Sequence, residues 1–387
     1  MLKIVASGIV FLTMTTALVA QEAATEAPGP IEPETLTVEK TIKPGANIFV
    51  LDQSWSGSSK INVLAAHDLS MKGNIGAGLV AEMALSADGK TLYTASAYAR
   101  RITKGETEAV LAEYDVETLT EKREIIISNR FAQVASQPSL LTLVDDEKYI
   151  LVQNATPATS VSVVDLTKGE QIAEIPTPGC WGILPAKSGS SFMSLCGDGS
   201  MKAYSFTADG TYSEPVTGAA IFDPDQDALF TNPARTTDGF LFISYNGNIH
   251  NVALKDGVPT LIDKFSITEG TEGWAPGGTS TVIGYSEPAN VAFVLMHSDA
   301  EDGSHKNPAE EIWAVDMATK QVLYRSKADE ENAIIVEQSM PPVLYVSGDE
   351  KSELNRYSVD PEAKFAAKPE AKAEDIGGFP TMLLLGQ

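Results

Sequence analysis

Short hydrophobic runs recur along the chain beyond residue 45, and the helical period is nearly absent there. Val, Ile, Leu, Tyr and Phe alternate with polar residues, and Gly, Asp, Ser or Asn separate one run from the next. Alternation with a period of two is typical of half-buried strands, and turn residues between the runs indicate antiparallel hairpins. The pattern therefore predicts an all-β protein.

One phrase is repeated: an alternating strand that ends in an acidic or other turn residue. Its copies end at Asp68, Asp115, Asp165, Phe206, Leu254, Asp316 and Asp360. A repeat of about 40–50 residues with four strands per repeat is typical of β-propeller blades. The seven copies predict a seven-bladed β-propeller. A pair of β-sandwiches and an eight-bladed ring are the alternatives.

Two irregularities in the repeat carry further predictions. The longest interval contains HSDAEDGSHKNP (297–308), which indicates a lengthened hairpin loop. The first blade, near 46–78, lacks an innermost strand, whereas the chain ends with the apolar run FPTMLLLG (379–386). Pairing of this C-terminal strand with the N-terminal blade would close the ring and remove a free sheet edge. We therefore predict one closed propeller over 46–387.

The N-terminus has the layout of a secretory signal peptide, which we assign to residues 1–20. Lys3 precedes an apolar run that is too short for a permanent membrane anchor, and small Ala20 marks the expected cleavage site. A buried N-terminal helix is the alternative. Residues 21–45 are rich in Ala, Glu, Pro and Thr, a composition that predicts a flexible arm. The mature protein is expected in the periplasm without a membrane anchor.

Composition excludes several classes of function. The chain has 28 Lys and Arg against 52 Asp and Glu, and its net charge of −24 disfavours nucleic-acid binding. Four His and two Cys are too few for a Cys-rich zinc or iron–sulfur framework. No HExxH, GxSxG or glycine-rich phosphate loop occurs. We therefore expect no catalytic residue or metal on this chain, and interpret it as a scaffold or binding module.

A metal site is a further alternative to that interpretation. His297 and His305 lie in the lengthened loop with Asp299, Glu301 and Asp302 nearby, so they could hold a metal ion together. A polar, solvated loop is the preferred explanation. A self-contained hydrolase with a metal in the central channel would need inward acidic or His residues on several innermost strands, and the sequence shows no convincing set.

The two cysteines have the spacing of a hairpin pair. Cys180 and Cys196 are equidistant from position 188, which lies in the plausible turn Lys187–Ser190. Residues equidistant from a hairpin turn face each other across the strands, and export exposes them to an oxidising compartment. One disulfide is therefore predicted. A catalytic thiol pair is the alternative, but no CxxC spacing or flanking His supports it.

Two tryptophans are candidates for a partner interface. A stable complex needs an apolar patch of sufficient area, ringed by polar groups. Trp274, in the loop Gly273–Gly278, and Trp181, with Phe131 and Phe192 in its surroundings, are the candidates. Ordinary packing between blades is the competing explanation for the same side chains.

Five segments together resemble a known family, and they occur in the same order as in that family. They are ARRITKGETEAVLAEYDVETL (99–119), GCWGILP…FMSLCGDGSMKAYSFTADG (179–210), NPARTTDGFLFISYNGNIHNVAL (232–254), GWAPGGTSTVIGY (273–285) and LMHSDAEDGSHKNPAEEIWAVDMATKQVLYR (295–325). The chain from about residue 46 onward is similar to the heavy subunit of the tryptophan tryptophylquinone amine dehydrogenases, the methylamine and aromatic amine dehydrogenase family. In that family the heavy subunit carries a disulfide at the positions matching Cys180 and Cys196.

The resemblance implies a division of labour between subunits. Heavy subunits of the family assemble with light subunits into a periplasmic α2β2 heterotetramer. Tryptophan tryptophylquinone is formed on the light subunit, so the resemblance implies no cofactor on this chain. The light subunit oxidatively deaminates a primary amine to an aldehyde and ammonia, and an amicyanin- or azurin-like blue-copper protein accepts the electrons. A free-standing exported propeller that binds proteins without catalysis is the alternative function.

The resemblance also implies a wall of the substrate channel. In the methylamine enzymes, an aromatic side chain in the segment matching Ser96–Arg100 gates the channel. The nearest aromatic residue is Tyr98, whereas counting back from Gly105 places the family position at Ala99. The sequence His305-Lys-Asn-Pro is closer to the aromatic amine enzymes. Methylamine and an arylalkylamine both remain open as the substrate.

Overall fold

The computed structural model describes residues 39–102, 104–348 and 351–386, and Lys40–Gln387 form one compact unit. The predicted signal peptide and most of the predicted arm lie outside the described residues. Within the described residues, no helix combines the length and the hydrophobicity needed to cross a membrane.

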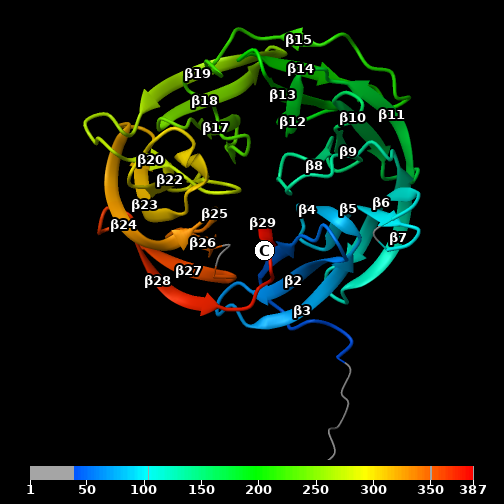
Figure 1. The fold of residues 1–387 in the computed structure, drawn as a ribbon, viewed down its shortest axis with the longest axis horizontal. Helices are drawn as coiled ribbons and strands as arrows, with labels where there is room; N and C mark the ends of the chain where they lie inside the picture. Colours follow the sequence, from blue (N-terminus) through cyan, green and yellow to red (C-terminus); the bar gives the residue numbers. More distant parts are fainter. Residues whose placement is uncertain (1–38, 103, 349–350, 387) are drawn as a thin grey trace, which may run out of the picture. The chain divides into compact units, whose positions relative to one another are not determined.

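The described residues form seven antiparallel sheets, which surround a common centre as the blades of a propeller (Figure 1). Blades 1 to 3 contain β29 (Pro380–Gly386), β1 (Asn47–Asp52), β2 (Ser59–Ala65) and β3 (Met71–Ala77); β4 (Leu79–Leu85), β5 (Thr91–Ala99), β6 (Thr107–Asp115) and β7 (Thr120–Ile127); and β8 (Leu141–Val144), β9 (Tyr149–Asn154), β10 (Ser160–Asp165) and β11 (Glu170–Pro176). Blades 4 and 5 contain β12 (Cys180–Pro185), β13 (Ser191–Cys196), β14 (Met201–Ser205) and β15 (Val216–Thr217); and β16 (Ala234–Arg235), β17 (Gly239–Ile243), β18 (Asn248–Lys255) and β19 (Val258–Ser266). Blades 6 and 7 contain β20 (Ala275–Pro276), β21 (Ile283–Ser286), β22 (Val291–His297), β23 (Ala309–Asp316) and β24 (Gln321–Glu331); and β25 (Ala333–Glu337), β26 (Val343–Gly348), β27 (Glu353–Asp360) and β28 (Ala366–Ala373).

The repeated phrase of the sequence corresponds to one structural position. Its seven copies lie in or at the end of β2, β6, β10, β14, β18, β23 and β27, the third strand of each blade counted from the centre. The prediction of a seven-bladed, all-β propeller is therefore confirmed. The lengthened loop is also found: β22 and β23 are joined by residues 298–308, which include the short 3-10 helix η1 (Ser304–Lys306).

The two ends of the chain close the ring as predicted. β29 pairs antiparallel with β1, so that Ile48 lies opposite Leu385 and Val50 opposite Leu383. Figure 1 shows β29 at the inner end of this blade, where every other blade has a strand from its own repeat. The C-terminal strand thus supplies the missing innermost strand of blade 1.

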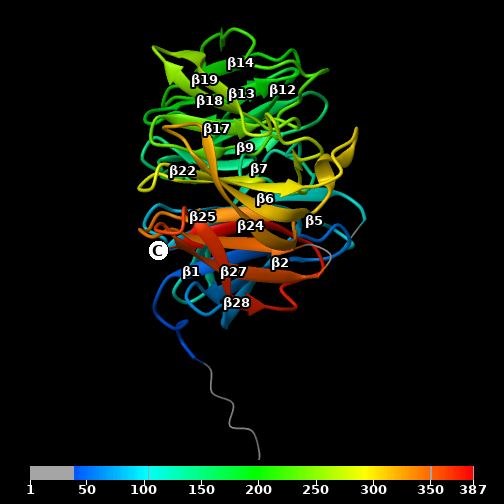
Figure 2. The same ribbon diagram turned by 90° about the vertical axis from the view of Figure 1, so that its left-hand side faces the viewer.

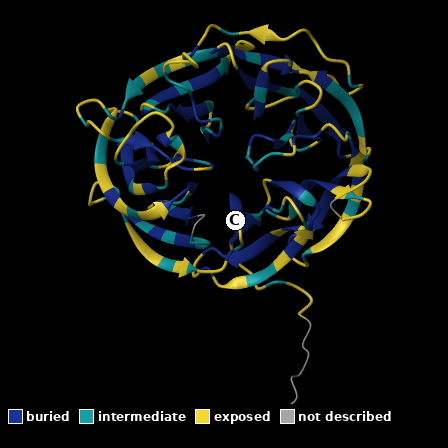
Figure 3. Ribbon diagram, viewed as in Figure 1, coloured by how far each residue is buried: buried dark blue, intermediate teal, exposed yellow. Residues whose placement is uncertain are grey.

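The hydrophobic core is a ring of clusters, each of which lies between neighbouring blades. Between blades 1 and 2, for example, Phe49 and Leu51 of β1 pack with Met83 of β4 and Met382 of β29. Figure 3 shows the inner strands buried, whereas the outer strands alternate between buried and exposed positions. The fourth strands β24 and β28 lie on the outer surface in both ribbon views (Figures 1 and 2). Burial therefore falls from the inner strands of each blade toward the rim.

The last residues assigned to the predicted arm contact the propeller. The Ile42 backbone N–H donates a hydrogen bond to the Glu117 carbonyl oxygen at 2.8 Å. The Ile42 side chain packs with Leu119 against the cluster between blades 1 and 2. A hydrophobic residue in an otherwise polar segment gives the chain this attachment point before β1 begins.

Candidate functional site

The ends of the strands divide the loops between two faces of the propeller. Because neighbouring strands are antiparallel, the connections from second to third strands and from one blade to the next share one face. Tyr98 and Ala99 end the second strand of blade 2, so we call this end the Tyr98 face. The hairpins from first to second and from third to fourth strands form the opposite end. We call this end the Lys187 face, after a residue of the β12–β13 turn.

Tyr98 packs at the junction of blades 1 and 2. Burial raises the pKa of its hydroxyl, and hydrogen bonding to Ser96 opposes that rise. The connection from blade 1 to blade 2 approaches this strand closely: the Gly78 N–H donates to Ser96 Oγ at 3.0 Å. A Cβ on Gly78 would lie 2.5 Å from the Ala97 carbonyl oxygen, so only glycine fits there. Ala99 is half-buried, and because side chains alternate along a strand, it points to the other side of the blade.

Four exposed hydrophobic side chains belong to the Tyr98 face. Trp55 is 54% exposed, Tyr98 39%, Ile102 77% and Phe379 38%, and all four belong to loops or strand ends of the Tyr98 face. We call these four residues the aromatic patch. Backbone hydrogen bonds join the Trp55 loop to Phe379, through the Gln53 N–H and the Phe379 carbonyl oxygen, and to the connection between blades 1 and 2, through the Val80 N–H and the Ser54 carbonyl oxygen. An exposed cluster of large apolar side chains is typical of an interaction site.

The connection from β5 to β6, which contains Ile102, carries positive charge. Arg100, Arg101 and Lys104 are all exposed on the β5–β6 connection, and among the described residues none of them pairs with a carboxylate within 4.0 Å. We call these three residues the basic loop. In a chain with a net charge of −24, this group of unpaired cations is a local exception. The aromatic patch is therefore bordered by these cations and also by the exposed carboxylate of Glu108, which lies opposite Tyr98 on β6.

Trp181 takes part in a polar network at the Tyr98 face of the central channel. Its indole Nε1–H donates to Gln137 Oε1 at 3.2 Å, and the Gln137 backbone N–H donates to Glu82 Oε2 at 3.1 Å. Glu82 is fully buried, and this burial raises the pKa of its carboxyl group well above the ordinary value. The network connects blades 2, 3 and 4, so the indole N–H of Trp181 is engaged in a contact within the propeller.

Trp274 is likewise engaged within the propeller. The Arg325 guanidinium lies 4.3 Å from the Trp274 ring and 4.5 Å from the Trp313 ring. Glu311 accepts hydrogen bonds from Arg325 Nε at 2.6 Å and from Trp313 Nε1 at 2.7 Å. Trp274 remains half-buried, so only part of its surface is available to a partner.

The remaining residues singled out from the sequence have structural roles. Cys180 and Cys196 lie directly opposite each other on β12 and β13 and form a disulfide. Phe131 and Phe192 are buried in the clusters on either side of blade 3. They are packing residues and not part of an exposed surface.

The two histidines of the lengthened loop have separate environments. His297 is buried, and its Nδ1 lies 2.6 Å from the Ser298 carbonyl oxygen. His305 stacks on Tyr245 with ring centroids 4.3 Å apart. Among the described residues, no three His, Cys, Asp or Glu side chains are placed to hold a metal ion.

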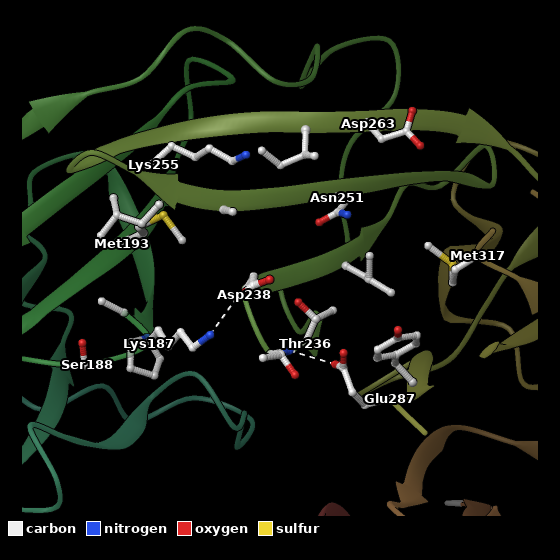
Figure 4. Close-up of a pocket in the computed structure, with 18 of the residues that line it drawn as sticks. Lys187, Ser188, Met193, Thr236, Asp238, Asn251, Lys255, Asp263, Glu287 and Met317 are labelled. Atoms are coloured by element: carbon white, nitrogen blue, oxygen red, sulfur yellow. Dashed lines mark hydrogen bonds and ion pairs between the residues drawn. The ribbon is translucent and has the colours of Figure 1, made fainter. Parts of the chain in front are cut away.

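The Lys187 face contains a polar cleft of about 730 Å³ between blades 4, 5 and 6 (Figure 4). The Lys187 ammonium pairs with the Asp238 carboxylate at 2.8 Å across its floor. The Thr237 N–H donates to the Glu287 carboxylate at 2.9 Å. Both of these carboxylates are engaged in contacts within the fold, and Asp256 and Asp263 also line the cleft.

Comparison with known proteins gives matches along nearly the whole propeller. The family model described as methylamine dehydrogenase heavy chain matches residues 46–384. A methylamine dehydrogenase heavy chain of Methylobacillus flagellatus is 25% identical over 356 residues, covering 89% of this chain and 87% of the relative. The methylamine dehydrogenase heavy chain of Methylorubrum extorquens is 26% identical over 347 residues, covering 87% of this chain and 82% of the relative.

Solved structures with the same fold are more distant in sequence. A periplasmic gluconolactonase of Pseudomonas aeruginosa has a TM-score of 0.61 at 15% identity, covering 88% of this chain and 98% of that chain. A β-propeller domain from Myceliophteria thermophila has a TM-score of 0.56 at 13% identity, covering 85% of this chain and 100% of that chain. These similarities show the propeller fold alone.

Proposed function

Because the chain belongs to the methylamine dehydrogenase heavy chain family, we propose that it is the propeller subunit of a periplasmic amine dehydrogenase. The observation that carries this proposal is the family match over residues 46–384, which includes almost the entire ring. The N-terminal sequence with the layout of a signal peptide supports export. In this account the mature chain assembles with a light subunit as an α2β2 heterotetramer.

The proposed reaction converts a primary amine and water to an aldehyde and ammonia, with release of two electrons and two protons. Tryptophan tryptophylquinone on the light subunit supplies the redox chemistry. This chain binds that subunit and forms part of the wall that excludes bulk water from the substrate. A blue-copper protein of the amicyanin or azurin type accepts the electrons. The substrate is methylamine or an arylalkylamine.

We assign docking of the light subunit to the aromatic patch and the basic loop. The patch has exposed apolar surface on loops and strand ends, and the basic loop adds unpaired cations that would attract an acidic partner surface. Tyr98 belongs to the patch and Ala99 directly precedes the basic loop, so a docked subunit would bring its substrate close to both. Trp181 and Trp274 remain candidates for the rim, since both are only half-buried.

Capture of the light subunit tests this proposal. The tagged chain, purified from the periplasm of its native host, should retain a small, Cys-rich, quinone-bearing subunit. Ile102→Glu should reduce its recovery at least about tenfold, because it places a charge at the most exposed apolar residue of the docking surface. Quantitative mass spectrometry of the eluate provides the measurement.

Val258→Glu is the matched control, since Val258 is also an exposed apolar residue but begins the fourth strand of blade 5 on the Lys187 face. This variant should retain the partner fully. Recovery of no companion by the unaltered chain would favour a free-standing propeller instead. Equal loss of light-subunit recovery in the two variants would exclude the assigned surface as the docking site.

A further inference from the structure

The central channel contains a recess that the proposed function does not use. It has a volume of about 370 Å³ and is lined mainly by the innermost strands of blades 1 to 5. Its apolar walls include Met83, Leu85, Leu141, Leu143, Ile183 and Met382. The volume falls within the roughly 300–1,000 Å³ that small-molecule sites occupy.

Arg235 is the one charged residue among those that line this recess. It ends β16, the innermost strand of blade 5, and its guanidinium carbon lies 5.8 Å from the centre of the Phe240 ring. Among the described residues, Arg235 forms no ion pair and its side chain makes no hydrogen bond. The guanidinium therefore has five N–H donors for which the fold provides no acceptor.

Among the described residues Arg235 shares its lack of an ion pair with Arg100 and Arg101, but unlike those two it lines the recess. Four arginines pair with carboxylates: Arg123 with Glu113, Arg130 with Glu174, Arg325 with Glu311 and Arg356 with Glu370. Carboxylates outnumber cations by 52 to 28, so a nearby acidic partner would be easy to supply. Arg235 nevertheless lacks one, although its side chain lines the recess and remains exposed to solvent there.

The surroundings of Arg235 are partly desolvated even though water reaches the side chain through the channel. Burial by the channel walls lowers the pKa of the guanidinium, and no carboxylate opposes this effect. A cation with incomplete hydration and low-polarity walls attracts an anion more strongly than a cation on the open surface does. A planar guanidinium also matches the two oxygens of a carboxylate in a bidentate arrangement.

We propose that this recess binds a small organic monocarboxylate, with its carboxylate on Arg235 and its hydrocarbon body against the apolar walls. One cation balances a single negative charge, and the walls offer no further charged group for a dianion such as phosphate. The recess lies on the innermost strands toward the Lys187 face, whereas the docking surface assigned above is on the Tyr98 face. The site therefore goes beyond the proposed function and does not depend on it.

Benzoate is a suitable probe, and isothermal titration calorimetry of the full mature chain provides the measurement. Benzoate should bind with saturation at one site per chain, and the neutral analogue benzamide at least about tenfold more weakly. Arg235→Gln should weaken benzoate binding by about tenfold or more, because it removes the charge and the bidentate donors. Arg235→Lys should give intermediate affinity, since it retains the charge alone.

Lys60→Gln is the control, because it removes an exposed cation of β2 that does not line the recess and should leave benzoate affinity unchanged. Thermal melting of each variant establishes that the propeller remains folded. Equal affinity of the unaltered chain and folded Arg235→Gln would overturn the proposal, as would the absence of saturable binding by the unaltered chain. Neither result would affect the test by capture of the light subunit, so the two proposals fail separately.

Discussion

At the scale of single residues, the propeller buries carboxyl groups that have no cationic partner. Glu331, at the end of β24, accepts hydrogen bonds from Asn355 Nδ2 at 2.9 Å and from the Tyr357 hydroxyl at 3.1 Å. Burial raises its pKa to about 8; these hydrogen bonds oppose the rise, and the charges of Asp329 and Glu353 add to it. Glu331 is therefore protonated in the folded protein at neutral pH.

This protonation makes folding stability depend on pH. The unfolded chain releases the Glu331 proton near the ordinary pKa of a glutamate, whereas the folded chain retains it until about pH 8. Between these values the folded state binds more protons, so the free energy of unfolding decreases as pH rises, by up to about 1.4 kcal/mol per pH unit. Glu331→Gln mimics the protonated side chain and should remove this contribution.

Urea unfolding from pH 5 to pH 9 measures the effect. The variant should gain stability relative to the unaltered chain as pH rises toward 8, and the difference should then level off. Glu269→Gln, at an exposed position, should follow the unaltered chain throughout. If the free energy of unfolding of Glu331→Gln and of the unaltered chain changed with pH in parallel, the Glu331 carboxyl group would have the same pKa in the folded and unfolded chain, which would contradict the prediction.

At the scale of elements, one strand from the far end of the sequence completes the ring. β29 lies between two clusters: Met382 packs between blades 1 and 2, and Leu383 packs between blades 7 and 1. Without β29, β1 would present an unpaired inner edge and both clusters would lose a side chain. Ring closure therefore depends on contacts between residues more than 300 positions apart in sequence.

Removal of residues 380–387 should lower the free energy of unfolding by at least about 3 kcal/mol, as expected for loss of two buried apolar side chains. A synthetic peptide of residues 378–387 should restore part of the loss by occupying the vacant position. A scrambled peptide of the same composition serves as the control. A truncated chain as stable as the full one would contradict closure by β29.

Strands could be predicted from the sequence where the hydrophobic pattern repeats from blade to blade. A strand that is too short to show an alternating pattern could not. Each third strand has several alternating residues and a terminal turn, so seven copies reinforced one another in the sequence. β16 has only two residues, Ala234 and Arg235, and no periodicity identifies so short a strand. Arg235 was missed for this reason. Glu82 was missed because a single acidic residue inside the apolar run of β4 carries no signal of its burial.

At the scale of the whole molecule, the two proposed binding surfaces lie toward opposite faces of the propeller. The aromatic patch and the basic loop occupy one face, whereas the recess around Arg235 lies toward the other. Strand alternation predicted the ring, but the grouping of Trp55, Ile102 and Phe379 depends on folding, because these residues come from distant parts of the sequence. Tyr98 was singled out only through a family resemblance.

The most direct test of the central claim is amine-dependent reduction of a blue-copper acceptor by this chain, measured with and without the light subunit. Methylamine and phenylethylamine serve as the two substrates. The account predicts no turnover of either amine by the mature chain alone, and turnover of at least one by the assembled complex. Amine oxidation by the chain alone, or an assembled complex that oxidises neither amine, would contradict it.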